Sequence, residues 1–482
     1  MGKNIRDDVK SDEQLDCRSA NPVNVNKERE IKGLLKFLTQ DRGGTNFKKI
    51  YEKIPEKYYE YLGFAIILLM IALLSVEEVN RIFVGNPKVD LYMWFFYLVG
   101  GLGEIFAVVY IGSVFADKEK PSLRKILKTH IWDLALCMML IWSIMSSFLS
   151  EYRDTAIGGT GYRHDGLMTY FVYAGMYVCG RAVKSDKLRI WILRSVGIVL
   201  TLLSFISILQ TNVDMLMNWG KIGKNLLMYN LYSAIFFNPN HFGYFLVIGL
   251  MALAGLVMIE KKMAVKITWL LIFGFDMWAL IINNTFGCYL AVLFGIIFLS
   301  AIILIHDKEK YKAVIAVATV FIAVSVGMNT YNHQLSSDFR LTYHQSKEVK
   351  TNDDAGSGRI GLWKQAVKYI EKKPVFGYGP EGLVLPYFID GFENDRPHNE
   401  YLQHAAFLGI PGLVFYLAAL VTIFVHCIKK IRRLSPYMLV AGGIVFAYCV
   451  SAFFGNTMYY TTPYYFIFLG VLSACHLESK KQ

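Results

Sequence analysis

The apolar residues of this chain fall into blocks of roughly 18 to 25 residues, separated by polar segments. A helix needs about 20 apolar residues to cross the roughly 30 Å hydrocarbon core of a membrane. Only 18% of the residues are charged and 54% are hydrophobic, whereas a soluble domain carries about 25% charged residues. The blocks therefore predict an all-α protein that crosses a membrane many times.

We expect about twelve transmembrane helices and one large polar loop. This divides the chain into a polar tail (1–58), helices one to nine (59–329), the large loop (330–403) and the last three helices with the C-terminus (404–482). The twelve predicted spans are 59–76, 91–115, 129–149, 167–181, 190–209, 242–259, 267–283, 286–305, 313–329, 404–427, 437–455 and 461–476.

The short loops on one side hold 19 Lys and Arg residues, and those on the other side hold 6. Basic residues in short loops stay in the cytoplasm. This bias predicts a multi-pass protein of the cytoplasmic membrane, with both termini in the cytoplasm and the large loop outside. The net charge of +12 is then explained by contacts with anionic membrane lipids, and no nucleic-acid partner is expected.

The large loop contains an amphipathic pattern from Arg359 to Ile370, typical of a short helix that ends before Pro374. The polar residues 330–355 are expected to be mobile. The predicted apolar face of the helix consists of Ile360, Trp363, Val367 and Ile370.

Four residues of this loop suggest chemistry on a phosphorylated substrate. Arg359 offers a fork of donors that suits phosphate oxygens, and the turn with Gly377 and Gly379 could hold an anion on its backbone amides. His398 could accept a proton near neutral pH. Together they suit attack by a hydroxyl group while pyrophosphate leaves. The alternatives are a helix-start residue for Arg359 and a capping or interfacial histidine for His398.

Two other segments on the same side carry candidate residues. Arg163 precedes the fourth span, where an interfacial anchor is an equal alternative. Asn240 lies in an Asn-Pro-Asn break before the sixth span, and broken backbone at membrane depth is tolerated only in a cavity or inside protein. For the neighbouring His241, a simple surface turn is the favoured interpretation.

Acidic residues give weaker signals. Asp390, Glu393 and Asp395 in the large loop are interpreted as a solvated face, and neither a metal site nor another cofactor is predicted. Glu104, Asp133 and Asp276 lie within predicted spans, where charges are functional by default. They could form a proton or ion relay or pair with a buried base, and the sequence alone does not pair them.

As a set, these motifs resemble the signature region of O-antigen ligases and the related O-antigen polymerases. The resemblance rests on Arg359 with Trp363, on Pro374 with Gly377 and Gly379, and on the Pro397-His398-Asn399 segment. It also includes Gly409 and Gly412, the Gly161–Gly166 loop and the Asn238–Asn240 break.

The resemblance implies a metal-independent, inverting membrane glycosyltransferase. Its donor would be a glycan on undecaprenyl pyrophosphate, and its acceptor a glycan, a lipid or a protein. Carried over to this chain, it implies that His398 is the catalytic base and that Arg359 and Arg163 bind the pyrophosphate, with Asn240, Gly377, Gly379 and Asn399 as further substrate-binding candidates.

Ligase and polymerase activity are not separated by these motifs. A transporter or flippase for lipid-linked glycans and an O-linked protein oligosaccharyltransferase also remain alternatives. A transporter would commonly show repeated halves with matching broken helices, and no such repeat is visible. The candidate residues instead concentrate in one late loop, which favours the enzyme.

Overall fold

The computed structural model describes residues 54–84, 91–116, 130–161, 163–228, 232–236, 238–348, 353, 355–356 and 358–475. Every element within these ranges is a helix, and they contain no strand. The helices belong to one compact unit, residues 55–482. The predicted polar tail at 1–58 falls almost wholly outside the described residues. The all-α, polytopic class is confirmed.

Ten helices are long and apolar enough to cross a membrane. Two of these spans include an adjoining 3-10 turn: η1 (Lys308–Lys310) precedes α15, and η3 (Ala452–Phe454) follows α20. They are α3 (Glu56–Val84), α4 (Leu91–Ala116), α6 (Ile131–Leu149), α9 (Asp186–Leu209), α12 (Pro239–Ile259), α13 (Met263–Asn283), α14 (Phe286–His306), α15 (Tyr311–Asn332), α19 (Glu400–Lys429) and α20 (Pro436–Ser451).

Two shorter helices occupy the remaining predicted spans. These are α8 (Leu167–Ala182) and α21 (Thr462–Ser473), which pack against each other. Each of the twelve predicted positions therefore holds a helix, although only ten meet the length for a full crossing.

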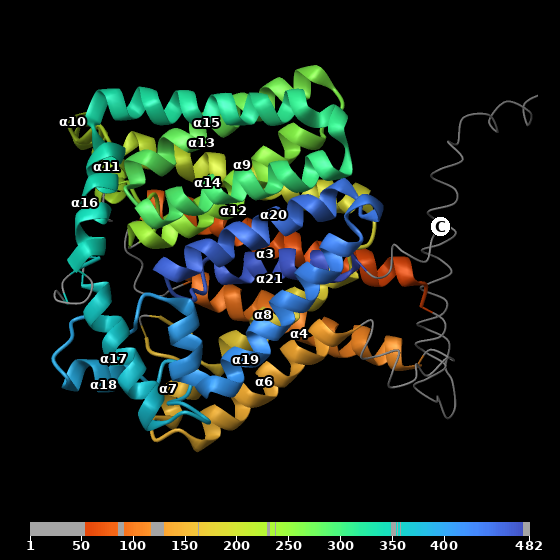
Figure 1. Cartoon of the computed structure of the whole chain (residues 1–482), viewed down its shortest axis with the longest axis vertical. Helices are drawn as coiled ribbons and strands as arrows, with labels where there is room; N and C mark the ends of the chain where they lie inside the picture. The colour runs from red at the N-terminus through yellow and green to blue at the C-terminus, as the bar shows by residue number, and fades with distance from the viewer. Residues whose placement is uncertain are drawn as a thin grey trace, which may run out of the picture. The chain divides into compact units, whose positions relative to one another are not determined.

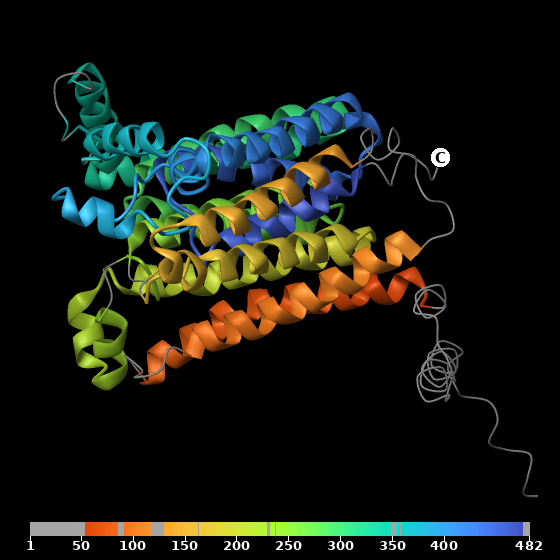
Figure 2. The ribbon, with the colours of Figure 1, turned by 90° about the horizontal axis from the view of Figure 1, so that it is seen from below.

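Helix α12 forms the centre of the bundle. It packs against α9, α13, α14 and α20, and its apolar window is fully buried. A helix that is surrounded on all sides must be apolar all round, and the sequence of α12 has this character. Figures 1 and 2 show the long helices running side by side through this unit.

The short helices gather at one end of the bundle, which we call the loop end (Figure 1). They are α7 (Arg153–Gly158), α10 (Val213–Asn218), α11 (Lys221–Leu227), α16 (Gln334–Glu348), α17 (Arg359–Lys372) and α18 (Val384–Ile389). The opposite end, with η1 and η2 (Ile431–Arg433), is called the far end.

Two details of the large loop differ from expectation. Residues 334–348 form α16 rather than an irregular segment. The amphipathic helix α17 is present, but the predicted apolar face was wrong, because Val367 is 42% exposed. The buried side chains are Leu362, Gln365, Ala366 and Tyr369, since packing on α19 selects this neighbouring stripe.

Helix α19 is broken at Gly409, which has a φ of 74°. The break leaves backbone groups without helical partners, and the 374–379 turn supplies partners for them. The N–H of Gly379 donates to Phe407 O at 2.8 Å, and the N–H of Ile410 donates to Pro374 O at 2.8 Å. Because every backbone group must be satisfied away from water, the turn and the broken helix form one structural unit.

We predict that Gly409→Ala destabilises the protein by about 2–4 kcal/mol. A Cβ atom at this position would lie 2.1 Å from Val375 O, and the positive φ disfavours any other residue. Thermal unfolding in nanodiscs measures the effect. Gly101→Ala is the matched control, because nothing lies within 4 Å of its added Cβ. Equal midpoints for the two variants would refute the structural role of the break.

Candidate functional site

The candidate site lies at the loop end, where three helices begin. Helices α8, α12 and α19 all start there. Arg163 lies shortly before α8 and His398 shortly before α19, whereas Asn240 lies in the first turn of α12. Arg359 is the first residue of α17, which lies at the same end (Figure 1). The structure therefore brings together the candidate segments that are far apart in the sequence.

Arg396 is the buried centre of this region. Its side chain is fully buried, and its guanidinium contacts Glu381 at 2.5 Å and Asp165 at 3.3 Å. Both carboxylates are also fully buried. Burial raises the pKa of Asp165 and of Glu381, and the charge of Arg396 partly offsets this. The cluster ties the loop before α8 to the loop before α19.

Further donors surround Asp165. The Tyr173 hydroxyl donates to Oδ1 at 2.8 Å, and Thr457 Oγ1 and Gln403 Nε2 contact Oδ2. A buried carboxylate is stable only when such donors satisfy it. Asp165 therefore joins α8, α19 and the segment between α20 and α21 in one hydrogen-bonded network.

Arg163 forms a two-point ion pair with Asp395. Its Nε and Nη2 atoms lie 2.9 Å from the two carboxylate oxygens, and its Nη1 lies 3.3 Å from His241 Nε2. Burial alone would raise the pKa of Asp395, but the charges of Arg396 and Arg163 hold this pKa well below its usual range. Asp395 thus orients Arg163 and offsets part of its charge. His241 lies within the cluster and not in a surface turn, contrary to its favoured interpretation.

His398 is held by two amide side chains. Its Nδ1 lies 3.1 Å from Asn456 Nδ2, and its Nε2 lies 3.2 Å from Asn394 Oδ1. Its backbone has a φ of 50°, which is uncommon for a residue other than glycine. Burial and then the charges of Arg359 and Arg163 lower the pKa of His398 to about 4. The ring is therefore neutral at physiological pH.

Among the arginines of the candidate site, Arg359 is the one that the protein engages least. It is partly exposed at the first position of α17, and its guanidinium forms no hydrogen bond or ion pair with any described residue. After burial, its charge is the largest cause that lowers the pKa of His398, so the field of Arg359 reaches the imidazole. A guanidinium with free donors can bind an anion, and a neutral imidazole can accept a proton from a hydroxyl group.

The other substrate-binding candidates have different surroundings. The Asn399 oxygen caps α19 by accepting from the N–H groups of Tyr401 and Leu402. Gly377 and Gly379 have φ values of 65° and 85°, and the amides of residues 377–379 donate to protein carbonyls. These amides are occupied, so the turn has a structural role in holding α19. Asn240 lies in the first turn of α12, next to His241.

Several residues of this site were not selected from the sequence. Asp395 was interpreted as part of a solvated face, which is wrong, because it pairs with Arg163 and Arg396. Glu381 and Asn456 gave no signal in the sequence, and Arg396 gave only a weak one. The hint for Arg396 was its position directly before the Pro397-His398-Asn399 segment, since a charged residue next to a candidate site can be buried there with charged partners.

The charges within predicted spans are separate from the site. Asp133 pairs with Arg181 at 2.8 Å, and Asp276 accepts from Thr201 Oγ1 at 3.1 Å. Of the two alternatives predicted for Asp133, a relay or a pair with a base, the structure shows the pair.

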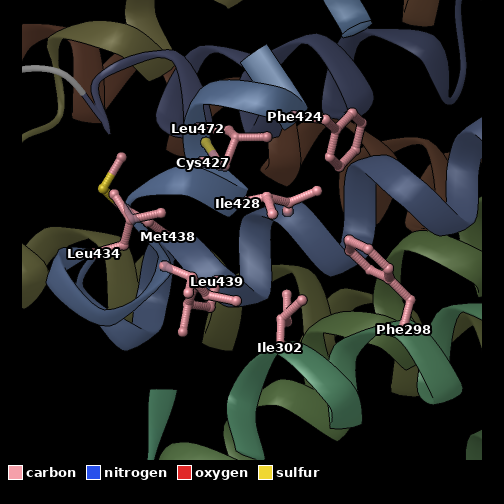
Figure 3. Close-up of a pocket in the computed structure, with 11 residues that line it drawn as sticks. Phe298, Ile302, Phe424, Cys427, Ile428, Leu434, Met438, Leu439 and Leu472 are labelled. Atoms are coloured by element: carbon pink, nitrogen blue, oxygen red, sulfur yellow. The ribbon is translucent and has the colours of Figure 1, made fainter. Parts of the chain in front are cut away.

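An apolar pocket lies at the far end, between α14, α19, α20 and α21 (Figure 3). Its lining includes Phe298, Phe424 and Leu472, with Cys427 as the sole thiol. It carries no charged or acid–base side chain and lies at the end opposite His398, so it is not part of the candidate site.

Comparison with protein families gives one match. Residues 269–417 match the family model described as O-antigen ligase. The matched region runs from α13 into α19 and includes Arg359, Arg396 and His398. No curated protein matches the chain.

Proposed function

From the O-antigen ligase domain that the chain carries at residues 269–417, we propose that it transfers a glycan from undecaprenyl pyrophosphate to an acceptor hydroxyl. The domain supports a glycan-transfer role in polysaccharide assembly at a membrane. The observation that supports the finer proposal is a His398 whose pKa is lowered by burial and by the charge of Arg359, an arginine that has no hydrogen-bond or ion-pair partner among the described residues.

In the proposed reaction, Nε2 of His398 takes the proton of the acceptor hydroxyl. The acceptor oxygen forms a bond to the anomeric carbon, and the bond from that carbon to the pyrophosphate oxygen breaks with inversion. The electron pair stays on the pyrophosphate, whose charge Arg359 stabilises. Arg163, oriented by Asp395, is the second candidate ligand for the leaving group.

These groups are sufficient for the chemistry. Pyrophosphate is a good leaving group, and one positioned base contributes about 10² to 10⁴ in rate. Positioning of two membrane-bound substrates can contribute several kcal/mol more, up to about 7–11 kcal/mol. The residues named here require no metal ion or other cofactor in the proposed step.

The charge distribution supports an outward-facing site. The short loops of one side hold 19 Lys and Arg residues against 6 on the other side. Lys261, Lys262, Arg432 and Arg433 of the larger set lie at the far end. Since such loops stay in the cytoplasm, we propose that the loop end faces the outside and both termini face the cytoplasm. The lipid-linked donor would then be used after it has crossed the membrane.

Complementation of a strain that lacks the gene tests the function. Wild type is expected to restore the surface glycan on a gel. If long chains depend on the protein and its loss leaves single lipid-linked repeats, the activity is that of a polymerase. If long chains form on the carrier and only their final attachment is lost, the activity is that of a ligase. Accumulation of donor on the inner face alone would contradict transfer and indicate a flippase.

We predict that Arg359→Ala lowers transfer about 10²- to 10³-fold, the effect of removing one group that stabilises developing charge. Arg359→Lys should recover only part of the rate, because a lysine lacks the planar fork. Lys364→Ala is the matched control on the same helix, since Lys364 forms only an exposed ion pair with Asp353. Wild-type transfer by Arg359→Ala would remove Arg359 from the mechanism.

We also predict that the rate of transfer stays level between pH 5 and pH 8 and falls only as the pH drops towards about 4. The base must be unprotonated, and the pKa of His398 is lowered to about 4, so its lone pair is lost only below that range. Initial rates in membranes from the complemented strain measure this profile. A fall centred near pH 6.5 would contradict the electrostatic setting of His398. The charged and titratable groups around it are Arg163, Arg359, Asp395, Arg396 and His241.

A further inference from the structure

The segment between α20 and α21 contacts residues of the candidate site. Its Thr457 donates to the buried Asp165, and Gln403 of α19 contacts Thr457. The segment is therefore fixed in the same buried network as Arg396. The preceding residue, Asn456, is 5% exposed and contacts Nδ1 of His398 at 3.1 Å.

The two amides that hold His398 differ in character. Asn394 on the Nε2 side is exposed, so an incoming hydroxyl can displace it. Asn456 on the Nδ1 side is buried, and so are the residues on either side of it in the chain. The Oδ1 atom of Asn456 has no hydrogen-bond partner among the described residues, so no other group fixes which end of its amide faces the ring.

We propose that Asn456 is a positioning residue for His398, which holds the ring with its proton on Nδ1 and its lone pair on Nε2. This inference rests on the proposed function and adds to it the group that orients the base. As placed in the structure, Nδ2 of Asn456 faces Nδ1 and Oδ1 of Asn394 faces Nε2, an arrangement that by itself fits a proton on Nε2. An amide can present either its oxygen or its NH₂ to a ring nitrogen. The unpartnered Oδ1 of Asn456 and the exposure of Asn394 leave both amides free to turn. With the oxygen turned to the ring, Nδ1–H donates to Asn456 Oδ1.

The proton balance of the step requires this tautomer. A histidine with its proton on Nε2 cannot accept another from a hydroxyl at that atom. With the proton on Nδ1, Nε2 takes the acceptor's proton as the new glycosidic bond forms. The resulting imidazolium keeps its Nδ1–H bond to Asn456 and then releases the Nε2 proton to water. The partner of the second ring nitrogen commonly sets which nitrogen reacts.

Two substitutions at position 456 separate positioning from packing. Asn456→Ala removes the acceptor and should lower transfer about 10- to 100-fold, part of the contribution of a positioned base. Asn456→Asp is nearly isosteric and keeps an acceptor oxygen, so it should retain transfer at pH 7. Its negative charge should raise the pKa of His398 and move the acid limb of the pH profile upward by about one unit. Asn332→Ala is the control, since Asn332 is an exposed amide at the loop end that contacts only a backbone N–H.

The rates are measured in membranes that contain the strain's own donor and acceptor. The tautomer is read separately from ¹⁵N chemical shifts of histidine-labelled protein in nanodiscs, with the His398 signal assigned by its loss in His398→Asn. Wild type is expected to carry the proton on Nδ1, and Asn456→Ala to gain the form with the proton on Nε2.

Wild-type rates and an unmoved acid limb in both Asn456 variants, with His398→Asn inactive, would overturn the positioning role and leave the proposed function intact. If Asn456→Ala fails to fold, Asn456→Asp carries the test, and an unchanged acid limb overturns the proposal. If His398→Asn is itself active, the assignment of the base fails, and the role of Asn456 fails with it.

Discussion

His398→Asn is expected to lower transfer about 10²- to 10⁴-fold, the contribution of one positioned base, while the protein still folds and inserts. Asparagine is the appropriate replacement because His398 has a φ of 50°, and asparagine tolerates that conformation better than alanine does. The substitution therefore removes the basic nitrogen without straining the start of α19. Surface glycan from the complemented strain and initial rates in its membranes measure the loss.

The matched control is His344→Ala. His344 is an exposed histidine of α16 at the same end of the bundle, so its removal tests the general effect of deleting a histidine there. Thermal unfolding of His398→Asn should be close to that of wild type. Normal transfer by a folded His398→Asn would show that the histidine is structural, and would bring the transporter alternative forward.

The membrane helices were predictable because their signal is local. An apolar block of sufficient length identifies a span wherever its neighbours lie, and each predicted span holds a helix. The edges were less certain, as in α19, which begins at Glu400 and not at residue 404. The buried face of α17 was not predictable, because Ile360 and Leu362 belong to two apolar stripes and only the packing against α19 selects one.

The site was predictable only in part. His398, Arg359 and Arg163 could be proposed as site residues because each lies in a recognisable motif, and the charges of both arginines act on the pKa of His398. Arg396 and Asp395 were missed because a charge in a polar loop normally faces water. Only the fold shows that Arg396 is enclosed by carboxylates from two distant loops. The glycine turn was expected to be able to hold an anion on its amides, and in the structure these amides donate to protein carbonyls, two of them in the broken helix α19.

Arg396→Met should lower the stability by about 3–5 kcal/mol, the usual cost of leaving buried charges without their partner. Methionine is similar in length but lacks the charge, so Asp165 and Glu381 remain buried with no cation between them. The midpoint of thermal unfolding in nanodiscs measures the loss. Arg153→Met is the control, because Arg153 is exposed and bonds only to a backbone carbonyl.

The pH dependence identifies the cause of this loss. Without Arg396, both carboxyl groups must take up protons to remain buried, so their pKa values in the folded state rise further above those of the unfolded chain. Groups of this kind stabilise the folded state at low pH and lose that contribution as the pH rises. The difference between Arg396→Met and wild type should therefore shrink from pH 8 to pH 5. Adding Asp165→Asn and Glu381→Gln should restore part of the stability at pH 8, whereas a deficit unaffected by pH or by these changes would indicate lost packing and not unpaired charge.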